Sequence, residues 1–259
     1  MPLRFYCLLM LIIISTPALP QAATPVRPMA QDAHPSFAVA TIKPHDPESS
    51  RQGFNAHGDR FTIQSQTVVS LLLFAYSIHP RQIIDAPDWA LRDRYDIEGK
   101  TDTEGEPSLR QQQEMIQKLL ADRFHLRFHP EKRELAVYAI RTAKGGAKLN
   151  PAANPDAQPD QRGNNRGPEL TQFYTSATIP DFILAMQFFV DRPLVDQTGL
   201  TGRYDFKIVY TPDEFRAPDT NTAPGIFTAV QEQLGLKFEA VKAPCDVFLI
   251  DSVERPPAN

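Results

Sequence analysis

Hydrophobic and polar positions follow the same order in two long stretches of the chain. In each stretch, segments that alternate apolar and polar side chains predict strands, and apolar residues at helical spacing predict helices. The predicted order in both stretches is strand, helix, strand, strand, helix and hairpin. Elements that are apolar on one face pack as layers, so the pattern predicts an α+β fold built from two tandem repeats.

The first module is predicted over residues 37–142. Ser65 or Thr67 can cap its first helix. Turn-forming residues at 130–132 lie between two strand-like segments and predict a hairpin. The second helix is expected from residue 108 to about residue 123. Its predicted buried face consists of Leu109, Ile116, Leu119 and Leu120.

The second module is predicted over residues 169–255. Pro180 suits the first turn of its first helix, and Gly235 suits the C-terminal end of its second helix. Strand-like segments at 237–241 and 245–252 predict a closing hairpin. The predicted buried face of the first helix consists of Phe182, Ile183, Met186 and Phe189.

Four segments fall outside the two modules. Residues 1–23 carry one basic residue, then an apolar run, then small residues, which is the pattern of a secretory signal peptide. Residues 24–36 are rich in proline and predict a flexible lead-in. Residues 143–168 hold almost no apolar side chains, so we expect a mobile linker there. Residues 256–259 form a short tail.

Charge and cysteine content narrow the expected partners and cellular location of the protein. The formal net charge of −4 disfavours nucleic acid as a partner. After the leader, no apolar run approaches the roughly 20 residues that span a bilayer. Removal of the leader would also remove Cys7 and leave Cys245 as a single thiol, which we expect to be buried. We therefore expect an exported protein, periplasmic or extracellular, without a membrane span in the mature chain.

One short motif occurs in both modules. Arg94-Tyr95-Asp96 in the first module corresponds to Arg203-Tyr204-Asp205 in the second. On a strand, the Arg and the Asp share one face and the Tyr lies on the other. A structural role is favoured, but an Arg fork also suits carboxylate ligands. The candidate recognition surface therefore consists of Trp89, Arg94, Asp96, Arg203 and Asp205.

Motifs that suggest catalysis or metal binding have simpler interpretations. His125 and His129 have the spacing of a zinc pair on a helix, but a strand there would separate them by about 13 Å. Asp196 begins a motif similar to that of aspartic proteases, but Gln197 interrupts it, so Asp196 is expected to cap a turn. The sequence has no phosphate-cradling loop, nucleophile elbow or paired-cysteine metal motif. We assign no catalytic residue, cofactor or metal ligand.

Segments spread over nearly the whole mature chain carry a family resemblance. They are 37–44, 122–124, 133–138, 144–146, 195–206, 227–237 and 250–256. These segments resemble a family of secreted proteins of unknown function that is abundant in soil Acidobacteria. The resemblance implies export and occasional fusion to a membrane-embedded sensor peptidase of the antibiotic-response type. It implies no established activity.

Each module is also similar to the short N-terminal domain of secretins and TonB-dependent receptors. Residues 61–67 with the helix after them carry this similarity in the first module, and residues 234–238 carry it in the second. In those proteins the domain serves periplasmic interaction and signalling. The similarity concerns the domain alone, and a role in a secretin or receptor assembly does not carry over to this chain.

The sequence favours a non-enzymatic binding or interaction protein of the cell envelope, whose partner is an envelope protein or a small ligand. An envelope hydrolase with a site between the modules is the alternative. Its candidate residues are His79, Asp85, Asp196 and Cys245. A ligand-sensing ectodomain is a third interpretation.

Overall fold

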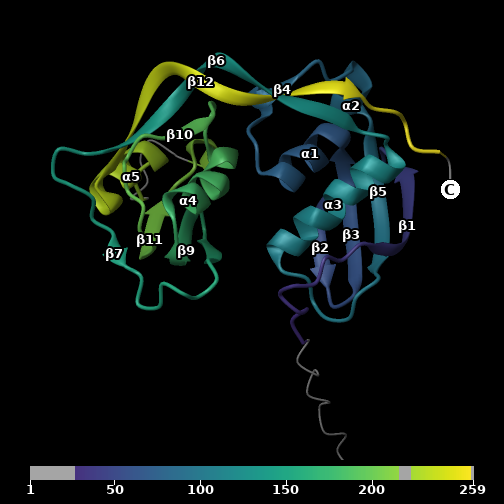
Figure 1. The fold of residues 1–259 in the computed structure, drawn as a ribbon, viewed down its shortest axis with the longest axis horizontal. Helices are drawn as coiled ribbons and strands as arrows, with labels where there is room; N and C mark the ends of the chain where they lie inside the picture. Colours follow the sequence, from purple (N-terminus) through teal and green to yellow (C-terminus); the bar gives the residue numbers. More distant parts are fainter. Residues whose placement is uncertain (1–26, 216–222, 258–259) are drawn as a thin grey trace, which may run out of the picture.

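Three four-stranded sheets organise the computed structural model, which describes residues 27–215 and 223–257 (Figure 1). The first sheet has the order β1-β5-β3-β2, and all its neighbouring strands are antiparallel. Its strands are β1 (Phe37–Pro44), β2 (Gly53–His57), β3 (Arg60–Thr67) and β5 (Arg94–Thr101). The helices beside it are α1 (Val68–Tyr76), α2 (Asp88–Arg92) and α3 (Leu109–Arg123), with a 3-10 turn η1 (Pro80–Gln82) after α1. We call residues 27–126 the first unit.

The second unit, defined as residues 143–235, contains a sheet of the order β7-β11-β9-β8, which is also antiparallel throughout. Its strands are β7 (Asn150–Pro151), β8 (Asp160–Arg166), β9 (Glu169–Ala177) and β11 (Tyr204–Tyr210). Its helical elements are α4 (Ile179–Met186), α5 (Ile226–Leu234), η2 (Gln187–Phe189) and η3 (Asp213–Phe215). The mixture of helices and sheets confirms the α+β class.

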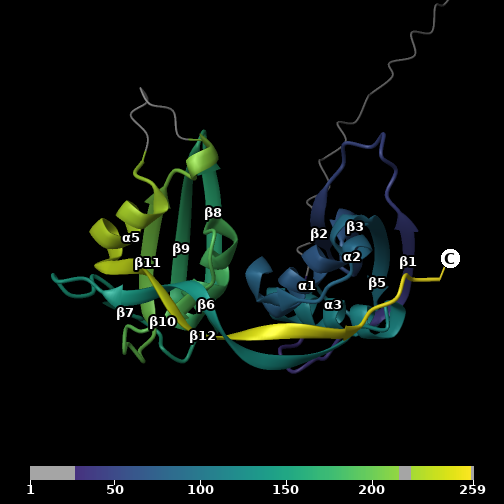
Figure 2. The same ribbon diagram turned by 90° about the horizontal axis from the view of Figure 1, so that it is seen from above.

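A long two-stranded ribbon connects the two units (Figures 1 and 2). It consists of β6 (Arg127–Thr142) and β12 (Leu236–Ser252), which pair antiparallel along their whole length. A short strand joins each side. They are β10 (Leu194–Asp196), parallel to β6, and β4 (Ile83–Ile84), parallel to β12. The strand that follows the first unit thus pairs with β10 of the second, and the strand that follows the second pairs with β4 of the first.

Both predicted hairpins are therefore wrong, because each is one continuous strand. Pro130 lies opposite Phe248, and Pro244 lies opposite Glu134, within the uninterrupted register. At these positions each strand has only one neighbour among the described strands, so a proline needs no hydrogen-bonding partner on its other edge. No residue between 126 and 145 has a positive φ, whereas the tight hairpin turns require one.

Segments expected to be irregular also take part in pairing. Part of the predicted linker 143–168 forms β8, whose exposed residues bond through their backbone to β9. A ladder of this kind satisfies backbone groups without burying apolar side chains, which is why composition failed to reveal it. The described part of the predicted lead-in packs on α3. The predicted signal peptide lies outside the described residues.

Helix ends agree with the local signals in the sequence. Thr67 caps α1 by accepting a hydrogen bond from the Ser70 N–H at 3.0 Å, and Gly235 ends α5 in the left-handed conformation, with φ of 63°. Two side chains predicted to be buried are exposed, Leu109 by 56% and Phe189 by 39%. Leu109 is the first residue of α3, and Phe189 lies in η2, beyond the end of α4, so neither continues the buried stripe of its helix.

Each unit has its own hydrophobic core. The first core joins α1 and α3 to the first sheet through Leu72, Ile97 and Leu120, which are at most 1% exposed. The second core gathers around Phe182 and Tyr210, both 0% exposed. None of the helices in the described residues has the length and apolar character needed to cross a bilayer.

Candidate functional site

The Arg-Tyr-Asp motif of the first unit forms hydrogen bonds with the backbone of a β-bulge. Ser65 has a φ of 57°, and the β3–β5 register shifts between Ile63 and Gln66. The Ser65 N–H donates to Asp96 Oδ1 at 2.8 Å, and Arg94 Nη1 donates to the Ser65 carbonyl at 2.7 Å. The Arg and the Asp therefore satisfy the two backbone groups that the bulge removes from the ladder.

The second unit contains the same arrangement. Ser176 has a φ of 50°, its N–H donates to Asp205 Oδ1 at 2.7 Å, and Arg203 Nη1 donates to its carbonyl at 2.7 Å. Hydrogen bonds from the backbone N–H groups of Ala153 and Ser176 hold the pKa of Asp205 below its usual range. We call each Ser-Arg-Asp set a bulge clamp. In each unit the bulge lies two residues before the N-cap threonine of the next helix.

The clamps account for four of the five predicted recognition residues. Their charged groups bind the backbone of their own unit, which is the structural role that the repeated motif favoured. Recognition of a partner by these residues stays a prediction. The clamp roles of Ser65 and Ser176 were not predicted, and Ser65 was only a candidate helix cap, although Ser-x-Thr before the first helix of both modules was the available signal.

Trp89, the fifth predicted residue, lies on α2 and packs against the first core. The Arg255 guanidinium carbon is 4.8 Å from the centre of its ring, in a cation–π contact. Arg255 also donates to Asp93 Oδ2 from Nη2 at 2.9 Å. The C-terminal segment therefore covers the indole, as expected for packing rather than for an open interface.

The four hydrolase candidates do not form a catalytic group in the described residues. His79 is 4% exposed, and its ring bonds to backbone atoms of Arg81 and Val190. Asp196 caps a turn, accepting from the Thr198 N–H at 2.8 Å. Burial raises the pKa of the Cys245 thiol, which disfavours the nucleophilic thiolate. Asp85 is a turn residue with a φ of 58°, and no described contact links two of these four side chains.

The two histidines with zinc-like spacing each pair with a different carboxylate. His125 Nδ1 lies 3.0 Å from Glu254 Oε2, and His129 Nδ1 lies 2.8 Å from Asp251 Oδ1. Both histidines are more than half exposed. The part of the chain that the structure describes contains no group of three or more side chains suited to a metal ion.

A groove of about 300 Å³ runs between β1 and α3. The β1 wall consists of residues 36–40, and β1 is an edge strand that pairs only with β5 among the described residues. Met115 and Leu119 of α3 contribute apolar atoms, while Lys118 and Arg123 bring positive charge. The side chain of Arg123 donates to the Ala40 carbonyl at 3.2 Å and so marks the outer edge of β1.

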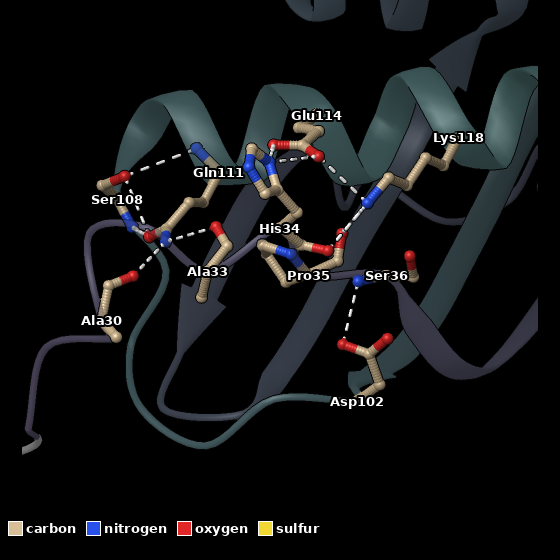
Figure 3. A network of polar contacts seen from close by, with 10 residues as sticks. All are labelled: Ala30, Ala33, His34, Pro35, Ser36, Asp102, Ser108, Gln111, Glu114 and Lys118. Atoms are coloured by element: carbon tan, nitrogen blue, oxygen red, sulfur yellow. Dashed lines mark hydrogen bonds and ion pairs between the residues drawn. The ribbon is translucent and has the colours of Figure 1, made fainter.

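A strap of residues 27–36 packs on α3, which also lines this groove, and Figure 3 shows the polar contacts between the strap and the helix. Gln111, which is 4% exposed, donates from Nε2 to the carbonyls of Ala30 and Ala33 at 2.7 and 3.1 Å. Lys118 Nζ donates to the carbonyls of His34 and Pro35 at 2.8 and 2.9 Å. These contacts fix the strap on α3, so the described part of the predicted lead-in is bound to the first unit.

A second groove, of about 450 Å³, lies beside the C-terminal end of α5. Lys144, Lys148 and Lys237 line it together with two glycines of the 143–148 loop. Lys148 Nζ donates to the Glu232 carbonyl at 2.7 Å, and Lys237 lies 3.6 Å from Glu239. Lys148 thus has a partner within the second unit, and Lys237 has one within the ribbon.

These features define an α+β protein with two sheets, each containing a bulge clamp, that are connected by one two-stranded ribbon. The groove beside the edge strand β1 is the best-formed candidate docking site. Residues 69–253 match a family described as a protein of unknown function, DUF3738. The chain belongs to this family, which agrees with the expectation of an uncharacterised family. No curated protein and no solved structure matches the chain.

Proposed function

We propose that this protein is exported to the cell envelope and acts there as a non-enzymatic interaction protein. In this proposal, the groove between β1 and α3 binds an extended segment of a partner polypeptide, which adds as a strand to the edge of the first sheet. The observation that carries the proposal is an edge strand whose outer side faces a groove lined by a helix. Edge strands bind peptides in this way through backbone hydrogen bonds.

The register indicates which backbone groups such a strand would meet. The His45 N–H bonds to the Arg94 carbonyl at 2.8 Å, and the same register pairs Lys43 with Asp96 and Thr41 with Glu98. Backbone groups alternate sides along an antiparallel strand, so those of Ala40 point outward. The bond from Arg123 to the Ala40 carbonyl supports this direction.

The lining of the groove suggests the chemistry of the partner segment. Every second side chain of an added strand would face α3, where Met115 and Leu119 offer apolar contact. Arg123 brings positive charge and Asp122 negative charge to the lining, so the charges there do not favour one sign of partner. We therefore expect an extended segment with small apolar residues at alternate positions.

We also propose that the two units arose by duplication of one module. Three features support this proposal. The sheets of the two units have equivalent strand orders, β1-β5-β3-β2 and β7-β11-β9-β8, and each unit contains a bulge clamp. Each unit also contributes one short strand to the ribbon, β4 from the first and β10 from the second. The resemblance of each module to a short periplasmic interaction domain is consistent with a binding role.

The test is a cross-linked affinity purification of the tagged mature protein from its native envelope fraction. The blocking variant is Ala38→Trp, because Ala38 lines the groove. The matched control is Thr41→Trp, which adds the same ring to an exposed position of β1 outside the groove lining. We expect one partner to be enriched by the wild-type protein and by Thr41→Trp, and lost with Ala38→Trp. Circular dichroism establishes that both variants are folded.

Two results would overturn the proposal. One is the absence of any partner above a tag-only control in the wild-type sample. The other is equal recovery of the same partner with Ala38→Trp, which would place the binding surface elsewhere.

A further inference from the structure

Besides the ribbon, a cluster of polar contacts among the described residues joins the two units. It joins the turn after α1 in the first unit to the segment after α4 in the second. Gln187 Nε2 donates to the Ser77 carbonyl at 2.8 Å, and these two residues are only 6% and 9% exposed. On the outside of the contact, Arg81 lies 3.9 Å from Asp191.

His79 lies at the centre of this contact, and the partners of its ring define its protonation state. Nδ1 lies 3.1 Å from the Arg81 N–H, which can only donate, so Nδ1 must accept and carries no proton. Nε2 lies 3.1 Å from the Val190 carbonyl, which can only accept, so Nε2 carries the proton. The geometry therefore requires a neutral imidazole with its proton on Nε2.

The same residue organises the turn on its own side. The His79 N–H donates to Gln82 Oε1 at 2.8 Å, while Gln82 Nε2 donates to the Asp246 carbonyl of the ribbon at 2.8 Å. A change at His79 is thus connected to the second unit through Val190 and to the ribbon through Gln82. We call the set of Ser77, His79, Gln187 and Val190 the latch.

We propose that the latch is a pH-sensitive connection, which holds the two units together while His79 is neutral and opens when His79 is protonated. A second ring proton would lie on Nδ1 and face the Arg81 N–H, so that two donors would oppose each other. The cap of the turn would be lost, and a positive charge would enter a site that is almost completely buried.

The charged groups around the ring have opposite effects on the protonation of His79. Arg81, on the turn of the first unit, disfavours a second positive charge, whereas Asp191, from the second unit, favours one. The Asp191 carboxylate already accepts from the Tyr138 hydroxyl of β6 at 2.8 Å and lies 3.4 Å from Arg192 Nε. The negative charge of Asp191 is therefore shared with Tyr138 and Arg192 and would balance a protonated His79 only in part.

The direction of the pH effect follows from the two states of His79. Burial, as the largest cause, lowers the pKa of His79 when the latch is closed. In an open state that exposes the ring to water, its pKa returns to the ordinary value of about 6.5. Below that pH the open state binds more protons than the closed state, so acid favours opening. The ribbon keeps the units connected, and opening changes their mutual orientation.

The experiment measures the separation of the units as a function of pH by energy transfer between two dyes. The dyes are attached to cysteines at Lys43 and Arg162, which are exposed and belong to different units, in a Cys245→Ala background. We expect one transfer efficiency at pH 8 and a different one at pH 5, with the transition below about pH 6.5. Far-ultraviolet circular dichroism should remain constant across the transition.

Two histidine variants identify the group responsible. His79→Gln keeps an N–H donor but does not titrate, and should give the same efficiency at both pH values. The matched control His129→Gln removes an exposed histidine that pairs with Asp251 at 2.8 Å and not with a latch residue, and should retain the transition. In the wild type, the titration of the His79 ring followed by NMR should coincide with the change in transfer.

The proposal is overturned if the wild type shows no change in transfer efficiency between pH 8 and pH 5. It is also overturned if His79→Gln retains the full transition, or if the His79 ring titrates at a pH different from that of the transition. The NMR result and the wild-type titration decide the question even if His79→Gln does not fold.

Discussion

Replacing the clamp arginines by methionine tests whether the repeated motif stabilises each unit. Methionine keeps much of the apolar stem of Arg94 or Arg203 but cannot donate to the serine carbonyl at 2.7 Å. A buried acceptor left without a donor costs about 1–3 kcal/mol. Ser176 is 0% exposed and Ser65 is 7% exposed, so we expect Arg203→Met near the upper end of this range and Arg94→Met near the lower end.

Urea unfolding followed by circular dichroism measures these free energies, and thermal unfolding should show a decrease of about 2–4 °C per kcal/mol for a chain of this size. The two clamps belong to different units, so the double variant should lose the sum of the single effects within about 0.5 kcal/mol. Arg92→Met is the matched control. Arg92 is 77% exposed and pairs with the exposed Asp88 at 3.5 Å, so its loss should cost less than about 0.5 kcal/mol.

The reasoning is refuted if Arg94→Met and Arg203→Met unfold at the same urea concentration as Arg92→Met. The arginines would then be free of a structural task, and the recognition hypothesis would become the better explanation of the repeated motif. Loss of a partner in the affinity purification, with unchanged stability, would establish that alternative.

Three further predictions follow from single residues. Two backbone donors lower the pKa of Asp205. The stability that its carboxylate adds to the folded protein is therefore complete above its ordinary pKa of about 4 and is lost as the pH falls through the lowered value. The urea midpoints of the wild type and of Asp205→Asn should differ at pH 7 and converge in acid. The raised pKa of Cys245 predicts reaction with a disulfide reagent at pH 8 at least roughly tenfold slower in the folded than in the denatured protein, and equal rates would contradict it. Gly235→Ala and Gly199→Ala both place a side chain at positive φ, 63° and 72°, but of the two only the new carbon at position 235 would meet backbone atoms. Gly235→Ala should therefore destabilise the protein by over about 1 kcal/mol more than Gly199→Ala in urea titrations. Equal losses of stability would exclude the clash.

The local elements were predictable because their signals lie next to one another in the sequence. Thr67, Ser108 and Thr178 each cap a helix by accepting a hydrogen bond from the N–H three residues later. The left-handed end of α5 at Gly235 follows from the freedom of glycine at positive φ. Such features depend on a few neighbouring residues, so a single sequence suffices to place them.

The ribbon was not predictable in the same way, because its pairing depends on residues far apart. Pro130 and Pro244 suggested turns, and only the partner strand shows that each lies at a tolerated position in a ladder. The strands β2 and β8 lack strong apolar alternation, and their neighbours hold them through the backbone. The clamp serines were missed for a related reason, since a Ser with positive φ is recognisable only once the Arg and Asp that bind it are in place.

The ribbon also decides when the first unit can finish folding. Phe248 and Ile250 of β12 pack against the first core, and the Glu254 N–H donates to the Phe124 carbonyl at 2.7 Å. Arg255 and Asp93, which are bonded, are 162 residues apart in the sequence. Since a chain is synthesised from its N-terminus, the first unit must wait, with part of its apolar surface uncovered, until the whole second unit has been made. A chain that stops before β12 would therefore leave both units incomplete, and the half made first would be the one exposed to aggregation and proteolysis for longest.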